Sequence, residues 1–182
     1  MMKRFASMVS ALLLLLSLAV AMTGAALEGT VLTVSERGLS ADIPSDFRVF
    51  TAEVDANNSG RFSYELMINS TDPEAGSIFL SILSVYDDVM RRMSPASLND
   101  LFLSAEISTV ESHGDVVVGN WSAIDPQGQN VTVLTLTTPD PRVSGGAYDM
   151  ASWNLDEDVQ VIMVSTTDSN VTEKLIGTLN IE

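Results

Sequence analysis

Cysteine is absent from this chain of 182 residues, and histidine occurs only once, as His113. Without cysteine the chain can form no disulfide bond, no thiolate metal site and no thiol nucleophile. A single histidine excludes a metal site built from several imidazoles and leaves one candidate imidazole base. These absences remove most common catalytic chemistry, so we expect no enzyme activity and no cofactor, weak Ca²⁺ binding aside.

Basic residues are also scarce, because 9 Lys and Arg stand against 24 Asp and Glu, for a formal net charge of −15. Such a chain repels the phosphates of nucleic acids and the head groups of anionic membranes, so neither is an expected partner. Hydrophobic residues make up 46% of the chain, enough for a buried core and too many for a disordered acidic tail. The length is that of one domain of ordinary size.

Residues 1–26 have the pattern of a signal peptide. Lys3 and Arg4 precede an uncharged run from Phe5 to Leu27 with five consecutive leucines, and small residues follow where a signal peptidase cleaves. We therefore expect export and a single mature domain over residues 27–182. The alternative is an uncleaved N-terminal membrane anchor, because the uncharged run is just long enough to span a bilayer.

Five Asn-x-Ser/Thr sequons indicate a glycoprotein. Their acceptor residues are Asn57, Asn69, Asn120, Asn130 and Asn170, and none of the five has proline at its middle position. About two would arise by chance in a chain with this content of Asn, Ser and Thr. The excess predicts N-glycosylation, with coincidence in a Ser/Thr-rich surface protein as the alternative. Together with high acidity and no cysteine, it favours an archaeal cell-surface protein over a disulfide-bonded secreted domain.

Hydrophobic patterns predict nine strands and two helices. The strands are expected at 30–35, 39–43, 47–54, 62–68, 77–86, 115–120, 131–137, 147–154 and 159–165. Segment 77–86 is apolar on both faces, which requires a covering layer on each side of the sheet. One helix should begin at the Ser94-Pro95 cap and fade near 108–110, and the second should begin near Asp168.

The order of these elements resembles that of PsbP-like domains, named for a photosystem accessory protein. The resemblance covers roughly residues 30–182 and rests on soft patterns, with no signature motif. Its residues are the strand entry Ile43-Pro44-Ser45-Asp46-Phe47, the strand 77–86, the Ser94-Pro95 helix start, the turn Val118-Gly119-Asn120-Trp121 and the closing helix that ends at 177–181. It implies an α+β fold: an α/β/α sandwich around a mainly antiparallel sheet with two main helices. Rival architectures are a lipocalin-like or cystatin-like sheet with a helix.

The resemblance also implies a binding or accessory role without catalysis. The metal site of the photosynthetic members uses His and acidic residues, so it cannot be carried over to a chain with one His. Residues 55–60 imitate the start of a calcium loop, but position twelve is Leu66 instead of an acid, which favours a hairpin turn. The acidic clusters at 87–88 and 154–158 leave only weak Ca²⁺ binding as an expectation.

Four residues are candidates for partner contact. Arg91 and Arg92 form the only paired basic site in a very acidic mature chain, although such residues more often satisfy nearby carboxylates. Trp121 and Trp153 could anchor a partner or stack on sugars, although tryptophan is more often a core residue. Ser112, His113 and Asp115 are too close in sequence for a catalytic triad.

The expected function is therefore that of an exported cell-surface or extracellular protein with a non-catalytic binding or accessory role. Its partner would be an envelope protein or a ligand, and it would contact a membrane only through an uncleaved leader. The alternatives are an extracellular carboxylate-dependent hydrolase and a structural surface glycoprotein. A pair of carboxylates facing each other in a pocket would distinguish the hydrolase.

Overall fold

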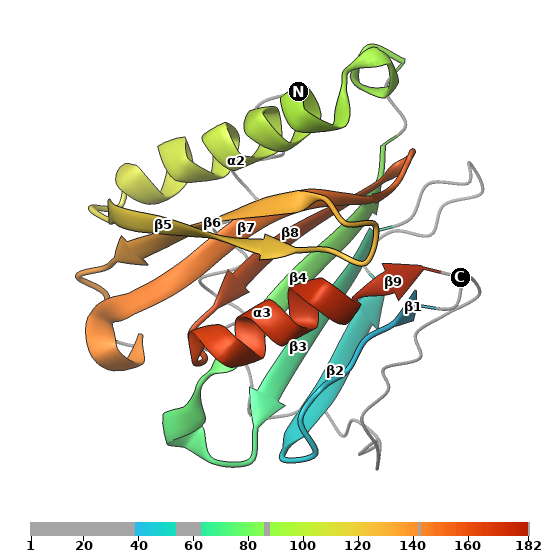
Figure 1. Cartoon of the computed structure of the whole chain (residues 1–182). Helices are drawn as coiled ribbons and strands as arrows, with labels where there is room; N and C mark the ends of the chain where they lie inside the picture. Colours follow the sequence, from blue (N-terminus) through green and yellow to red (C-terminus); the bar gives the residue numbers. More distant parts are fainter. Residues whose placement is uncertain (1–38, 54–62, 86–87, 142, 182) are drawn as a thin grey trace.

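The computed structural model describes residues 39–53, 63–85, 88–141 and 143–181. Its centre is a seven-stranded sheet in the order β2-β3-β4-β8-β7-β6-β5, in which all neighbouring strands are antiparallel (Figure 1). The strands are β2 (Phe47–Glu53), β3 (Ser63–Ser70), β4 (Ser77–Ser84), β5 (Val116–Ile124), β6 (Asn130–Thr137), β7 (Ala147–Asp156) and β8 (Val159–Ser165). An α+β fold with a mainly antiparallel sheet and two helices is thereby confirmed.

The smaller elements are a two-stranded sheet and short 3-10 turns. β1 (Leu39–Ser40) pairs antiparallel with β9 (Asn180–Ile181) in a separate two-stranded sheet. The 3-10 turns are η1 (Pro73–Ala75), η2 (Met90–Arg92) and η3 (Ser144–Gly146). The strand expected at 39–43 is shorter than predicted because its partner β9 is only two residues long. The strand expected at 30–35 and the expected leader lie outside the described residues, and no helix among those described is long and apolar enough to cross a membrane.

Both helices begin where the sequence predicts. Ser94 Oγ accepts a hydrogen bond from Ser97 N at 3.2 Å and Pro95 follows it, so α2 (Pro95–Glu111) has a side-chain cap and a residue preset for the first turn. Asp168 caps α3 (Ser169–Thr178) by accepting from Asn170 N at 2.8 Å. Each cap satisfies a backbone donor that a helix start leaves without a partner.

The two helices cover opposite faces of the sheet. The face under α3, which we call the α3 face, carries the larger core. α3 contributes Leu175 and Ile176 to it, and Leu179 follows directly after the helix. The sheet residues that it covers are mostly aliphatic: Leu66, Ile68, Ile78, Leu80, Ile82, Val133, Ala151, Trp153, Val161 and Met163. Each fully buried large side chain of this kind stabilises the fold by roughly 1.5–3 kcal/mol, so this cluster is the main source of stability.

The opposite face, the α2 face, is covered by a helical stripe at four-residue spacing. Leu98 and Phe102 pack with Val85 and Ile162. About two turns after Phe102, Val110 packs with Leu136, Tyr148 and Met150. Between Phe102 and Val110, the stripe position is occupied by a buried carboxyl, Glu106.

Gly76, just after η1, shows how closely β4 approaches the end of β8. Its φ is 81°, and a Cβ atom there would lie 2.4 Å from Thr166 O. Two hydrogen bonds join Thr166 to Ser77. Ser77 N donates to Thr166 Oγ1 at 2.9 Å, and Thr166 N donates to Ser77 O at 2.9 Å. Glycine is therefore required at this position both for its backbone conformation and for the space it leaves.

We expect Gly76→Ala to lower the free energy of unfolding by about 2 kcal/mol more than Gly128→Ala does. Gly128 is the matched control: its φ is 79°, and no described atom lies within 4 Å of its Cβ position. Both variants place alanine at a positive φ, but only the first also displaces Thr166. Urea denaturation of the two variants measures the difference, and equal losses would contradict a steric role for Thr166.

Candidate functional site

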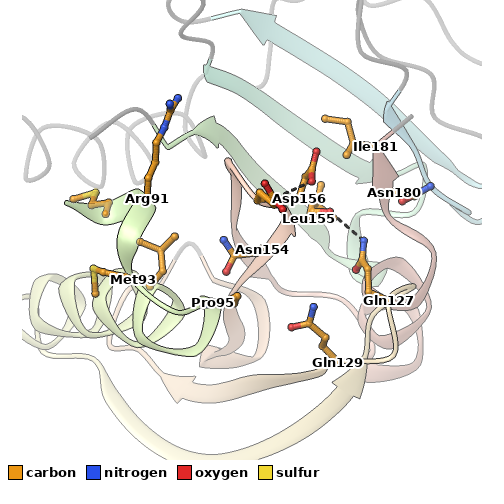
Figure 2. Close-up of a pocket in the computed structure, with 13 residues that line it drawn as sticks. Arg91, Met93, Pro95, Gln127, Gln129, Asn154, Leu155, Asp156, Asn180 and Ile181 are labelled. Carbon is orange, nitrogen blue, oxygen red and sulfur yellow. Dashed lines mark hydrogen bonds between the residues drawn. The ribbon is translucent and has the colours of Figure 1, made fainter. Parts of the chain in front are cut away.

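A pocket with a volume of ≈ 450 Å³ lies beside the start of α2 (Figure 2). Its walls come from η2 and the first turn of α2, the β5–β6 turn, the β7–β8 turn and β9. Its polar lining consists of the amides Gln127, Gln129, Asn154 and Asn180 and the charged residues Arg91, Asp156 and Glu157; its apolar lining consists of Met90, Met93, Pro95, Leu98, Leu155 and Ile181. This volume is within the range of pockets that bind small molecules or short peptide segments.

Hydrogen bonds hold the pocket walls in place. Gln127 Nε2 donates to Leu155 O at 3.0 Å and so joins the β5–β6 turn to β7. The turn itself is fixed by Asp125, a buried residue whose Oδ1 accepts from Gln129 N at 2.8 Å. Arg91 Nε donates to Val85 O at 2.7 Å, which anchors the guanidinium beside the end of β4. The site is therefore largely preformed.

Two amide oxygens in or beside this pocket accept no hydrogen bond from the described part of the protein. They belong to Asn154, which lines the pocket, and Gln160, which lies opposite it in the β7–β8 ladder. Gln160 is fully buried, and its Nε2 donates to Asn99 Oδ1 at 2.9 Å and to Ser152 Oγ at 2.7 Å. Both oxygens are shielded from solvent, and a buried acceptor without a donor lowers the stability of the fold at this end of the sheet.

The pocket has no catalytic arrangement of the kind that the hydrolase alternative requires. Its two carboxylates, Asp156 and Glu157, are exposed neighbours in one tight turn, where Asp156 Oδ1 accepts from Glu157 N at 2.7 Å. Glycoside cleavage needs two carboxyl groups on opposite sides of the scissile bond. The lining residues also include no Ser, Thr, His, Lys or Tyr that could act as nucleophile or base.

His113 lies away from this pocket and does not form a triad. Its Nδ1 is 2.9 Å from Thr109 O and 3.5 Å from Ser112 Oγ, and the ring is exposed. The Asp115 carboxylate is occupied elsewhere, since its Oδ2 accepts from Tyr148 OH at 2.8 Å in a buried pair. Burial, followed by this hydrogen bond and the Asp115 charge, raises the pKa of the Tyr148 hydroxyl well above its usual range.

The structure separates the four residues expected to contact a partner. Arg91 lines the pocket, whereas Arg92 is exposed and does not. Trp121 is half-buried on β5 and packs against the α3-face core. The expectation for Trp153 needs correction: its side chain is only 1% exposed in that core, so no partner can reach it.

The sequons of the described segments reach the surface to different degrees. Asn120, Asn130 and Asn170 are exposed, and Asn69 is half-buried on β3. Asn57 and the calcium-like loop at 55–60 lie outside the described residues. Within the described segments, no group of three or more acidic or histidine side chains is placed to hold a metal ion.

The amides Gln127, Gln129 and Asn180 were missed by sequence reasoning. They come from a turn and from a terminal strand that are distant in sequence, and only the fold brings them beside Asn154. Residues 125–128 have the composition of a turn, but nothing in their local pattern indicates that they lie against β7.

Glu106 is a buried carboxyl whose pKa is shifted toward neutral pH. It is 7% exposed on the sheet side of α2, and burial raises its pKa from 4.5 to about 7. Tyr148 and the apolar residues Ile162 and Met150 belong to the clusters on either side of it. Because it lies under α2 and does not line the pocket, Glu106 affects stability and not ligand chemistry.

We expect the protein to lose stability as pH rises from 4.5 to about 7. A raised carboxyl pKa means that the folded state holds the proton more tightly, so Glu106 has no destabilising effect below pH 4.5 and its full effect above pH 7, about 3 kcal/mol. Glu106→Gln should therefore raise the unfolding free energy at pH 8 but not at pH 4.5. Glu111→Gln, at the exposed end of the same helix, is the control; equal effects of the two variants at pH 8 would contradict the role of burial.

Comparison with known proteins gives no relative: no protein-family model matches this chain, and no curated protein is significantly similar to it.

Proposed function

We propose that this chain is an exported cell-surface protein that binds an extended peptide segment of an envelope partner without catalysing a reaction. The observation that carries the proposal is the lining of the pocket. Four amide side chains, Arg91 and two carboxylates surround it. Amide groups both donate and accept hydrogen bonds, as a peptide backbone does.

The apolar side of the pocket supports a peptide more than a sugar. Met90 and Met93 are flexible and can adapt to different apolar side chains. Sugars are commonly bound by stacking on an aromatic ring, and no aromatic residue lines the pocket. The two tryptophans that could have stacked on a sugar belong to, or pack against, the core.

Other features support export and an accessory role. The leader pattern of residues 1–26 and the five sequons are those of an exported glycoprotein. The resemblance to PsbP-like domains, whose members act mainly as accessory proteins, implies the same kind of role. The site lacks the paired carboxylates of a hydrolase, so we do not propose that activity.

The test is selection of a random 12-residue peptide library on the mature exported protein, followed by affinity measurements. Enriched peptides should bind Arg91→Ala and Gln129→Ala about tenfold more weakly, because each loses about 1.4 kcal/mol of hydrogen bonding or charge. Arg92→Ala removes the same charge one residue away, outside the pocket, and should bind like the wild type.

Two results would overturn the proposal. The first is no enrichment above a library panned on the support alone. The second is enriched peptides whose affinity falls equally in Arg91→Ala and Arg92→Ala, since this would indicate attraction to basic charge and not recognition by the pocket.

A further inference from the structure

The β5–β6 hairpin forms one edge of the sheet, and its two strands carry no charge. Neither strand contains a charged residue, although the whole chain has a net charge of −15. Large hydrophobic side chains are exposed along β5: Val116 is 56% exposed, Val118 58% and Ile124 53%. An edge strand of this kind presents backbone groups that another chain can pair with, unless something protects it.

The other edge of the sheet is protected in the ordinary way. β2 carries the exposed Arg48, and a charged side chain on an edge strand opposes pairing with another chain. β5 has only partial protection. A register shift lies between Val117 and Gly119, and α3 approaches its far end, where the Cβ position of Gly177 is 3.3 Å from Ile124 O.

The two sequons of this hairpin lie side by side on its exposed surface. In the ladder Ser122 is opposite Thr132, Asn120 is opposite Leu134, and Asn130 is opposite Ile124. Residues directly opposite in an antiparallel pair point to the same face, and so do residues two apart along a strand. Asn120, Ser122, Asn130 and Thr132 therefore share one face, and all four are exposed.

The middle residues of both sequons point the other way. Trp121 and Val131 pack in or against the core of the α3 face. Each sequon thus presents its asparagine and its hydroxyl together on the outside, which is the arrangement that glycan attachment leaves accessible in the folded protein.

We propose that Asn120 and Asn130 carry N-linked glycans that cover the β5 edge and prevent it from pairing with β5 of a second copy of this chain. Attachment forms a bond between the asparagine Nδ2 and the anomeric carbon of a lipid-phosphate-linked oligosaccharide; the lipid phosphate leaves and the amide loses one proton. The inference rests on the export included in the proposed function, but not on the pocket.

Geometry explains why a glycan on this face would block strand addition. A strand added to β5 would lie about 4.8 Å away, and its side chain opposite Asn120 would have its Cβ only about 5 Å from that of Asn120. A sugar linked to Asn120 occupies this space. In self-pairing about Asn120, two glycans would meet. Without glycans the uncharged strands can approach despite the negative charge elsewhere, and they bury Val116 and Val118.

The experiment uses the full chain, exported by a host that glycosylates Asn-x-Ser/Thr sequons, with intact mass and light scattering after size-exclusion chromatography as readouts. The wild type should be monomeric and heavier than its mature peptide, and Asn120→Gln and Asn130→Gln should each lose one glycan mass. The double variant should form dimers or larger species at micromolar concentration. Adding Val118→Lys to it should restore the monomer, because the charge opposes pairing.

Control variants separate the glycan from the asparagine side chain. Asn170→Gln removes an exposed sequon at the start of α3, away from the hairpin, and should leave the protein monomeric. Ser122→Ala with Thr132→Ala removes both hairpin sequons while keeping both asparagines, and should associate as the double asparagine variant does.

Either of two results would overturn the inference. One is a wild type of bare peptide mass with a cleaved leader, which refutes glycosylation while leaving export and pocket binding intact. The other is a double variant that stays monomeric. An uncleaved chain retained in the cell would instead refute export, and with it the foundation of both proposals.

Discussion

The constraint on which the rest of the fold depends is that β4 and β8 are buried on both faces. In β4 only Ser77 and Leu83 are partly accessible, and in β8 only Val164 is. Such strands cannot face water, so each side of the sheet needs a layer over its centre. α3 supplies one layer and α2 the other, and their positions follow from this requirement.

Covering the centre leaves the margins of the sheet for other uses. α2 begins beside the end of β4, where Arg91 bonds Val85 O, and the β5–β6 and β7–β8 turns come together at the same end of the sheet. The pocket is the space that these segments leave between them. The sheet contacts of α2 are chiefly with β7, and on β5 the cluster under α2 includes Val117, while Val118 and Ile124 stay exposed. The polar pocket and the uncharged edge are therefore both consequences of how the helices cover the sheet.

Local patterns predicted most of the elements because the period of a strand and the cap of a helix are properties of neighbouring residues. Ser94 and Asp168 marked both helix starts, and segment 77–86 indicated a layered architecture. The candidate site was different. Arg91 was identified as unusual, but the amides around it converge from segments far apart in sequence. The prediction for Trp153 was wrong because it rested on residue type alone, and tryptophan occurs both at binding surfaces and in cores. Trp153 alternates with Ala151 and Leu155 along β7, and all three side chains lie in the core.

The pairing of β1 with β9 has a consequence for how the domain is connected. Leu39 lies opposite Ile181, so the first and last described strands lie side by side (Figure 1). Asn180 and Ile181 also line the pocket. A segment held there would consequently lie beside the paired ends of the described domain.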